Sequence, residues 1–472
     1  MIRVFSQYIS PKSLVLMFLE SGLIMLALLC GIRLRAWDAA STFFTYVADP
    51  GFPLQAALFV GIFQVCFYYC DLYSPSAIGR RNEQLICLGQ SLGAGCLLLG
   101  FLYFLFPSLV LRSGIFFFSI TFAAGFVMLS RLALDRIWNT IPMQEGVAIL
   151  GTGPLALTVA RELTRREDLN AKLTGFLDPH AAGENPDDPQ CSLCGCPVWG
   201  TGLGLEALVK EHKISRIVVA LENCRNALPI RELVKLRVQG IKVEDSHSAI
   251  SSLTGRVWLE TVKPSWFVFS DGFQRSNLTI VLKRSIDLAS ALLGLVFCSP
   301  IMLAVAIAIR IDSKGPIFYR QTRVGLGGRL FEVIKFRSMR VDAEVGNKPQ
   351  WASANDSRVT RLGRFLRKYR LDEFPQFVNI IRGEMSLIGP RPERPVFVDQ
   401  LRNYIPYYDE RHSVRPGLSG WAQVQYQYGA SVEDAARKLE YDLFYLKNMS
   451  VLFDLAIIMQ TIRIVIGGHG GR

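Results

Sequence analysis

The chain has 472 residues, of which half are hydrophobic and only 19% are charged. This composition excludes a disordered or fibrous protein and argues against a fully soluble one, because soluble domains carry roughly 25% charged residues. The net charge is +12, and residues 282–382 hold 18 Lys/Arg against 8 Asp/Glu, so most of the surplus lies in one block. Such a block indicates an anionic partner: nucleic acid, a phosphorylated ligand or an anionic membrane surface.

Four apolar stretches fill the first third of the chain, at residues 14–32, 54–69, 85–106 and 114–134. Each approaches the roughly 20 residues that are needed to cross a bilayer. The first is not expected to be a cleavable signal peptide, because no small-residue cleavage site follows it. Lysine and arginine are more frequent on the side that holds the N-terminus, which predicts that this terminus and everything after residue 136 are cytoplasmic. The residues compared are Arg3, Lys12, Arg80, Arg81, Arg131 and Arg136 against Arg33, Arg35 and Arg112.

From about residue 141 the pattern changes to that of a soluble α/β domain. Residues 147–150 and 217–220 predict buried parallel strands, and another strand is predicted to end at Asp178. Gly151-Thr-Gly-Pro-Leu-Ala156 after the first strand fits a Rossmann-type dinucleotide turn, with a helix from there through Arg166. Pro154 inside the turn favours a degenerate, ligand-free Rossmann-like domain, and a bound nucleotide is the alternative.

The cysteines do not predict a disulfide scaffold, because six of the ten lie inside apolar runs. The remaining cluster is Cys191, Cys194 and Cys196, and a zinc site there would need His180 or His212 as a fourth ligand. A reduced surface loop is the simpler interpretation, and it suits a cytoplasmic location.

A fifth apolar segment, residues 286–309, differs from the first four because basic residues flank both of its ends. Ser299-Pro300 lies in its middle. Proline removes a helix hydrogen bond, so a kink or break is predicted there. A re-entrant hairpin that enters and leaves on the cytoplasmic face explains both features, and a kinked fifth span is the alternative.

Residues 360–369 predict an amphipathic basic helix, with Leu362, Phe365, Leu366 and Tyr369 on one face. This helix suits the membrane interface, and it equally suits packing on a protein core with a solvated basic face.

Asp372 and Glu373 follow this helix directly. They are interpreted either as helix-capping acids or as a nucleophile with a metal ligand beside it. Further on, Arg391 stands between two prolines, and a guanidinium on so stiff a loop suits phosphate recognition.

Six motifs then occur in order along the second half of the chain. They are Lys283-Arg284 with Asp287, Ser299-Pro300, Lys335-Phe-Arg-Ser-Met339, Leu371-Asp-Glu-Phe-Pro-Gln376, Gly383-Glu-Met-Ser-Leu-Ile-Gly-Pro-Arg-Pro392 and Arg415-Pro-Gly-Leu-Ser-Gly-Trp421. Together, over roughly residues 280–472, they resemble the bacterial sugar transferase family, the monotopic polyprenyl-phosphate phosphoglycosyl transferases. The spans and the Rossmann-like domain resemble its long members, which prime exopolysaccharide or O-antigen synthesis. Short members carry an Asn-Gly-Arg-type stretch near residues 425–428, which this chain lacks, so the sugar stays open.

The resemblance implies transfer of a sugar 1-phosphate from a UDP-sugar to undecaprenyl phosphate, with release of UMP and a covalent phosphosugar–aspartyl intermediate. The aspartate matching Asp372 is the family's nucleophile, and Glu373 helps to hold Mg²⁺. As substrate-binding residues we expect Arg367, Arg391, Lys283, Arg284 and Asp442, with Asp454 as the alternative to Asp442. Ser299 and Pro300 are expected to be structural.

The expected fold class is membrane α-helical plus α/β. Residues 1–140 are expected to form a four-helix transmembrane domain, 141–265 a Rossmann-like cytoplasmic domain, and 266–472 an α-rich catalytic domain with a re-entrant helix at 284–310. The expected location is the bacterial inner membrane, with the catalytic domain on the cytoplasmic face. Expected partners are a UDP-sugar (glucose or galactose by resemblance), undecaprenyl phosphate and the membrane, without nucleic acid; a homodimer is left open.

Two other classes of protein share parts of this pattern. Membrane-anchored nucleotide-sugar dehydratases also join four spans to Rossmann-type domains, but they usually carry a Tyr-x-x-x-Lys pair, and the sequence has none after residue 140. A non-enzymatic basic scaffold or nucleotide sensor is the second rival, and it requires the Asp372–Glu373 pair to be purely structural.

Overall fold

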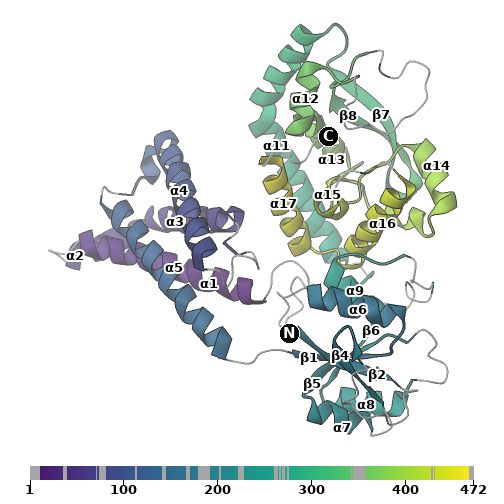
Figure 1. Ribbon diagram of the computed structural model, residues 1–472. Helices are drawn as coiled ribbons and strands as arrows, with labels where there is room; N and C mark the ends of the chain where they lie inside the picture. Colours follow the sequence, from purple (N-terminus) through teal and green to yellow (C-terminus); the bar gives the residue numbers. More distant parts are fainter. Residues whose placement is uncertain are drawn as a thin grey trace. The chain divides into compact units, whose positions relative to one another are not determined.

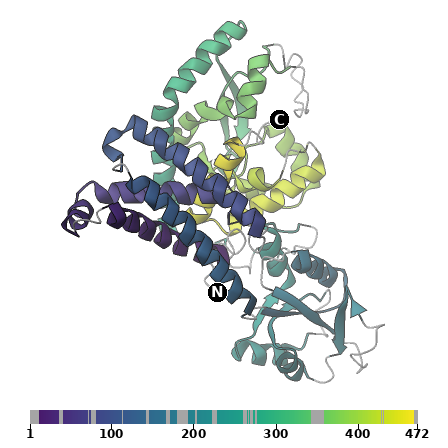
Figure 2. The same ribbon diagram turned by 60° about the vertical axis from the view of Figure 1, so that its left-hand side comes forward.

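The computed structural model of the protein describes residues 11–35, 40–70, 72–73, 81–111, 114–140, 145–165, 171–178, 192–200, 204–221, 228–259, 264, 267, 272–273, 276–341, 343, 358–426, 429 and 431–466. The chain divides into two compact units, Met1–Ser246 and His247–Arg472, whose elements are drawn in Figures 1 and 2. Of the residues named above, Arg3, Arg80, Arg112, Arg166, His180 and Cys191 lie outside the described residues, as do positions 427–428.

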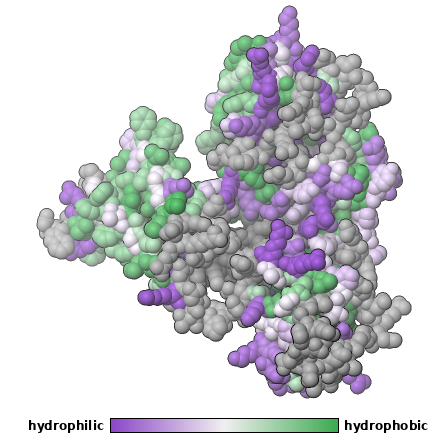
Figure 3. Space-filling view, in the orientation of Figure 1, coloured by the Kyte–Doolittle hydropathy of each residue, from purple (hydrophilic) through white to green (hydrophobic). Residues whose placement is uncertain are grey.

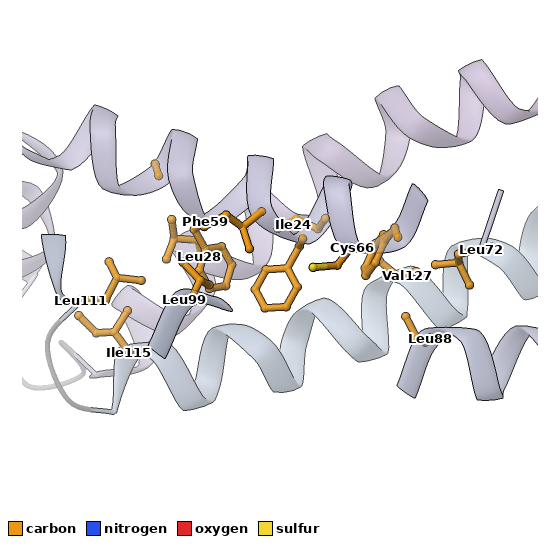
Figure 4. Packing of buried hydrophobic residues seen from close by; sticks show 14 of the residues in the cluster. Ile24, Leu28, Phe59, Cys66, Leu72, Leu88, Leu99, Leu111, Ile115 and Val127 are labelled. Carbon is orange, nitrogen blue, oxygen red and sulfur yellow. The ribbon is translucent and has the colours of Figure 1, made fainter. Parts of the chain in front are cut away.

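A bundle of apolar helices forms the first part of unit Met1–Ser246. Its long helices are α1 (Pro11–Arg35), α3 (Phe52–Tyr69), α4 (Arg81–Leu105) and α5 (Ile115–Thr140), with the short α2 (Ala40–Val47) and η1 (Pro107–Leu109). Each long helix contains a stretch that is long and apolar enough to cross a membrane. Leu28 and Phe59 pack at the centre (Figure 4), whereas Phe104 is 81% exposed. Hydrophobic residues cover much of the visible bundle surface (Figure 3), as expected for helices that face lipid.

One polar network is buried inside this apolar bundle. Arg131 Nε donates to Glu20 Oε1 at 2.7 Å, and the Tyr73 hydroxyl donates to Glu20 Oε2 at 2.7 Å. Arg131 Nη1 donates to the Leu72 carbonyl at 2.9 Å. Since an unpaired charge is costly among apolar side chains, this pair specifies how α1 packs against α5.

A six-stranded sheet follows, in the order β3-β4-β2-β1-β5-β6. Its strands are β1 (Glu145–Leu150), β2 (Ala171–Asp178), β3 (Ser192–Leu193), β4 (Cys196–Gly200), β5 (Ile214–Val219) and β6 (Lys242–Asp245). All neighbours pair in parallel except β3 and β4. In Figure 1, α6 (Pro154–Arg165) lies on one face and α7 (Leu205–Glu211) with α8 (Ile230–Val238) on the other. The predicted parallel α/β sheet is confirmed.

The glycine-rich turn after β1 is tightly packed. Gly151 has φ +122°, and a Cβ at this position would lie 2.6 Å from the Ala220 carbonyl oxygen, so only glycine fits. Asp178, at the end of β2, accepts a bond from the Thr152 hydroxyl at 3.3 Å. This acidic side chain therefore bonds to the glycine-rich turn itself.

Unit His247–Arg472 contains one long helix, α11 (Asn277–Asp312), and many shorter elements. Around it lie α9 (Ser246–Thr254), the hairpin of β7 (Phe318–Val324) and β8 (Leu330–Phe336) with η4 (Leu326–Gly328) between them, α12 (Arg361–Lys368), η5 (Leu371–Gln376), α13 (Phe377–Arg382), β9 (Ser386–Ile388), α14 (Pro395–Tyr404), η6 (Tyr408–Ser413), β10 (Gly417–Ser419), α15 (Trp421–Gln425), α16 (Val432–Lys447) and α17 (Val451–Ile466). Strands β9 and β10 pair in parallel. Each lies within one of the sequence motifs, β9 within residues 383–392 and β10 within residues 415–421.

Helix α11 is a further candidate membrane helix, and it packs against its own unit along both halves. Ala291 in the first half packs with Ile380 and Met385, whereas Val305 and Ile309 in the second half pack with Phe336 and Leu366. The outward side chains are apolar: Leu292, Leu293, Val296, Phe297, Ile301, Leu303 and Ile307 are all exposed.

The helix runs through Pro300 without an interruption, so the break that was predicted there is wrong. Pro300 has no N–H to donate to the carbonyl of Val296 one turn earlier. The Ser299 hydroxyl donates to that carbonyl at 2.8 Å. The serine thus supplies the hydrogen bond that the proline removes. The re-entrant path through a membrane stays a prediction.

Candidate active site

The two adjacent carboxylates lie on η5, directly after the basic helix α12. The Thr360 hydroxyl caps α12 by accepting a bond from Gly363 N at 2.9 Å. Arg370 then turns the chain with φ +54°, a conformation that non-glycine residues rarely adopt. Asp372 and Glu373 follow, and each is only 7% exposed. The N-cap of η5 is Arg370, with no side-chain capping bond, so helix capping does not explain the burial of these acids.

Glu373 is held by two cations from different elements. Its Oε1 accepts bonds from Lys335 Nζ on β8 at 3.0 Å and from Arg391 Nη2 at 2.9 Å. Burial alone raises the pKa of Glu373, but Lys335 and Arg391 more than offset that effect and bring it well below its usual range. Glu373 is therefore ionised at neutral pH.

Asp372 differs from its neighbour in its titration. Burial raises the pKa of Asp372; Lys335 opposes this effect, and the negative charge of Glu373 reinforces it. Arg367 and Arg391 also act electrostatically on this carboxyl group. Two neighbouring carboxyl groups whose pKa values are pushed apart are typical of catalytic sites, where they take different roles.

Arg391 lies on a loop that backbone contacts clamp in place. Gly417 N donates to the Pro390 carbonyl at 2.9 Å. A Cβ on Gly417 would lie 2.1 Å from Gly389 N, so no side chain fits between the two segments. The two prolines and these contacts fix the backbone of the loop from which the Arg391 side chain projects.

Gln423 on α15 and Arg411 on η6 also hold Arg391, and Asp442 on α16 holds Arg411. Gln423 Oε1 accepts bonds from Arg391 Nη1 at 3.2 Å and Arg370 Nη1 at 3.1 Å. Arg411 Nη2 donates to the Arg391 carbonyl at 3.0 Å and to Asp442 Oδ2 at 2.8 Å. Asp442 is 1% exposed, and burial raises its pKa to about 6 against the opposing charge of Arg411. Asp442 thus acts on Arg391 through Arg411.

Arg367 projects from the last turn of α12. Its Nε donates to the Ser338 hydroxyl at 2.9 Å. Lys335, Arg367, Arg370 and Arg391 together place four cations around two carboxylates, so the site retains a positive surplus. Such a site is suited to an anionic ligand that carries phosphate groups.

The other predicted substrate contacts are engaged with protein groups. Lys283 Nζ binds Asp454 Oδ2 at 2.6 Å and the Ile388 carbonyl at 2.9 Å. Arg284 donates to the Ile380 carbonyl at 2.8 Å, near the C-terminal end of α13. Asp454 also accepts a bond from the Tyr445 hydroxyl. These contacts anchor α11 to the domain, and a role of Lys283 and Arg284 in substrate binding stays a prediction.

Four residues of this constellation were not predicted as site residues: Lys335, Arg370, Arg411 and Gln423. Arg370 directly precedes the motif that begins at Leu371. Lys335 opens one of the quoted motifs, so a signal for it existed. Gln423 lies two residues after the motif that ends at Trp421, without a pattern of its own. Arg411 gives no signal in the sequence, because only the fold brings it against Arg391 and Asp442.

Comparisons with known proteins bear on this geometry. Residues 278–468 match the family model described as bacterial sugar transferase. An exopolysaccharide production protein of Rhizobium leguminosarum bv. phaseoli is 37% identical over 194 residues, which are 39% of this chain and 95% of that protein. The chain belongs to the bacterial sugar transferase family. The resemblance drawn from the six motifs is confirmed, and all four site cations and both carboxylates lie within the matched residues.

Two other relatives match longer stretches of the chain. A UDP-N-acetylgalactosamine-undecaprenyl-phosphate N-acetylgalactosaminephosphotransferase of Aeromonas hydrophila is 42% identical over 242 residues, 51% of this chain and 56% of that protein. A UDP-glucose:undecaprenyl-phosphate glucose-1-phosphate transferase of Escherichia coli (strain K12) is 35% identical over 264 residues, 54% of this chain and 55% of that protein. The chain spans about half the length of these two relatives. Residues 69–244 match a second family model, described as a CoA-binding domain.

Proposed function

We propose that this protein transfers a sugar 1-phosphate from a UDP-sugar to undecaprenyl phosphate and releases UMP, which primes exopolysaccharide or O-antigen repeat-unit synthesis. The observation that carries the proposal is the buried Asp372–Glu373 pair among four cations, within the segment that defines the family. The names of the Aeromonas and Escherichia relatives, which both refer to undecaprenyl phosphate, support it. Both substrates of the proposed reaction carry phosphate, which a positive site attracts.

The proposed chemistry has two displacements at one phosphorus atom. A carboxylate oxygen of Asp372 attacks the β-phosphorus of the UDP-sugar, the bond from that phosphorus to the bridging oxygen breaks, and UMP leaves with this oxygen. A phosphate oxygen of undecaprenyl phosphate then attacks the same phosphorus, and the bond to Asp372 breaks. A covalent intermediate suits substrates that arrive from two phases, because they need not be bound together.

Asp372 is suited to the nucleophilic role because its carboxylate is more basic than an ordinary one. Burial raises its pKa, and the positive charge of Lys335 opposes that rise. Attack on a diphosphate brings two negative groups together, so the repulsion must be offset. Arg391 and Arg367 are proposed to bind the remaining phosphate oxygens, with Arg391 oriented by Glu373.

We propose a magnesium ion that is shared between Glu373 and the substrate. No group of three or more His, Cys, Asp or Glu side chains that could hold a metal occurs among the described residues. Mg²⁺ is commonly held by one or two carboxylates together with substrate phosphates and water, and Glu373 is ionised as a ligand must be. Glu373 is the proposed ligand. When bound, the ion would neutralise phosphate charge and polarise the phosphoryl group.

The membrane arrangement is part of the proposal. Membrane association follows from the apolar helices, and we propose four crossings by α1, α3, α4 and α5, with the catalytic unit on the cytoplasmic face of the inner membrane. For α11 we propose a re-entrant path on one side. Its support is that both halves of α11 pack against the same domain, through Ala291 and through Val305 with Ile309, which a helix crossing to the other side could not do.

The proposal is tested by adding a panel of UDP-sugars and undecaprenyl phosphate to the purified full chain in detergent and measuring UMP. Release with one sugar, dependent on the lipid for turnover and abolished by Asp372→Asn, is the expected result. A protein that folds but releases no UMP with any UDP-sugar would contradict it, and would favour the scaffold or sensor interpretation.

A further inference from the structure

Residues 255–259, here called the strap, bind helix α16 of the catalytic unit through a single residue. Val257 N donates to the Glu440 carbonyl at 3.0 Å, and Leu259 N donates to Glu440 Oε1 at 3.3 Å. Arg256 Nη1 pairs with Glu440 Oε2 at 3.2 Å. Glu440 is 3% exposed, so water does not reach its carboxylate, and these protein groups supply its hydrogen bonds instead.

The strap binds α15 in the same way. The Gly255 carbonyl accepts a bond from Trp421 Nε1 at 2.9 Å. Trp421 is 1% exposed, and its indole N–H has no route to solvent. Without the strap, the buried Trp421 indole would lose this bond, and buried Glu440 would keep the bonds from Arg437 but lose those from the strap, and each lost bond is costly.

Two residues beyond each of these anchors lies a group that holds Arg391. On α15, Gln423 follows Trp421 and binds the Arg391 guanidinium at 3.2 Å. On α16, Asp442 follows Glu440 and binds Arg411, which donates to the Arg391 carbonyl at 3.0 Å. Residues two apart point to different faces of a helix, so each helix binds the strap on one face and supports Arg391 from another.

We propose that the strap positions Arg391 for phosphate binding, through α15 and α16 together. Two separate routes lead from residues 255–259 to the side chain and the backbone of Arg391, and each consists of hydrogen bonds joined by a short helix segment. Arg391 Nη2 in turn binds Glu373 beside the nucleophile. Along the sequence, α9 lies between β6 and the strap. The chain that leaves the α/β sheet therefore passes through the strap before it reaches the elements of the reaction site. This inference rests on the proposed function.

A double-mutant cycle in the full chain tests the strap, because only coupling between two changes identifies a positioning role. Arg256→Gln removes the positive charge of the strap that pairs with the Glu440 carboxylate. Arg437→Gln is the matched control, since Arg437 Nη1 lies 3.1 Å from the same Glu440 oxygen but belongs to α16. UMP release is measured for each variant alone and combined with Arg391→Lys, with thermal unfolding as the check on folding.

Arg256→Gln is expected to lower kcat about fivefold, the size of effect typical of residues that share one network, whereas Arg437→Gln changes kcat less than twofold. In the Arg391→Lys background, Arg256→Gln should cost less than twofold more. Glu440→Gln, which keeps an acceptor for Leu259 N, should repeat this pattern if Arg256→Gln folds poorly. A full fivefold loss in the Arg391→Lys background, equal losses for the two arginine variants, or no loss for Arg256→Gln would overturn the strap's role. Absence of UMP release by the wild type would instead overturn the proposed function, and the strap's role with it.

Discussion

Replacing Lys335 by methionine tests the electrostatic account of the acid pair. Lys335 Nζ makes a charge-assisted bond of 3.0 Å to Glu373 Oε1, and its charge is the main influence that lowers the pKa of Asp372 against the effect of burial. Methionine keeps the volume and removes the charge. Arg391 still pairs with Glu373, so the fold is expected to persist.

The direction of the effect follows from the protonation state that attacks. Without Lys335 the pKa of Asp372 rises further, so at a given pH a smaller fraction is ionised. One hydrogen bond to a charged group contributes about 1.5–3 kcal/mol, and each ~1.4 kcal/mol is a factor of ten in rate. Because the Lys335 side chain is 22% exposed, we expect the lower part of that range, roughly a 10- to 30-fold loss of kcat/KM at neutral pH.

The assay is the pH dependence of kcat/KM for UMP release. In Lys335→Met the acid limb should move to higher pH and the deficit should shrink as the pH rises, whereas Lys335→Arg should keep the wild-type profile. Lys368→Met is the control for loss of one exposed charge from the same basic block, and it should leave the limb in place. An acid limb at the same pH in Lys335→Met and wild type would refute the assignment of Asp372 as the attacking carboxylate.

Three other predictions concern Asp442, Glu20 and Gln423. As the pH falls through about 6, Asp442 takes up a proton and its ion pair with Arg411 is lost, so the kcat of the wild type should fall there. Asp442→Asn should be several-fold slower, and its kcat should not show this fall. Glu20→Gln leaves Arg131 unpaired inside the apolar bundle and should lower the free energy of unfolding by about 3 kcal/mol, seen as a lower melting temperature in detergent, whereas replacing both residues with methionine should restore most of it. Gln423→Leu removes the acceptor that orients Arg370 and Arg391, so the substrate should lose roughly one charge-assisted hydrogen bond and its KM should rise about tenfold. An unchanged KM for the UDP-sugar would argue against an orienting role of Gln423.

Local patterns in the sequence were sufficient for elements whose signal is short-range. The apolar run 147–150 lies within β1, Asp178 ends β2 as expected, and the basic helix predicted over 360–369 is α12. Residues 217–220 overlap β5, which begins three residues earlier. Each of these elements is specified by hydrophobic periodicity or a glycine turn, which a single segment carries by itself.

The composition of the site could be predicted only in part, because its partners come from distant elements. An adjacent Asp–Glu pair after a basic helix is equally consistent with capping and with chemistry, and only burial and the absence of a capping bond separate the two. Lys335 and Arg391 meet at Glu373 from a strand and a loop that lie far apart in the chain. Arg411 becomes relevant solely through its bonds to Arg391 and Asp442.

The most direct test of the account is to trap the intermediate on Asp372. The full chain is incubated with the UDP-sugar that supports UMP release, without undecaprenyl phosphate, and the intact mass and the peptide containing residues 371–376 are measured. The account predicts one equivalent of UMP per active protein and a phosphosugar adduct on Asp372, discharged when undecaprenyl phosphate is added and missing in Asp372→Asn. Normal turnover by Asp372→Asn, or turnover by the wild type without any adduct on Asp372, would contradict it.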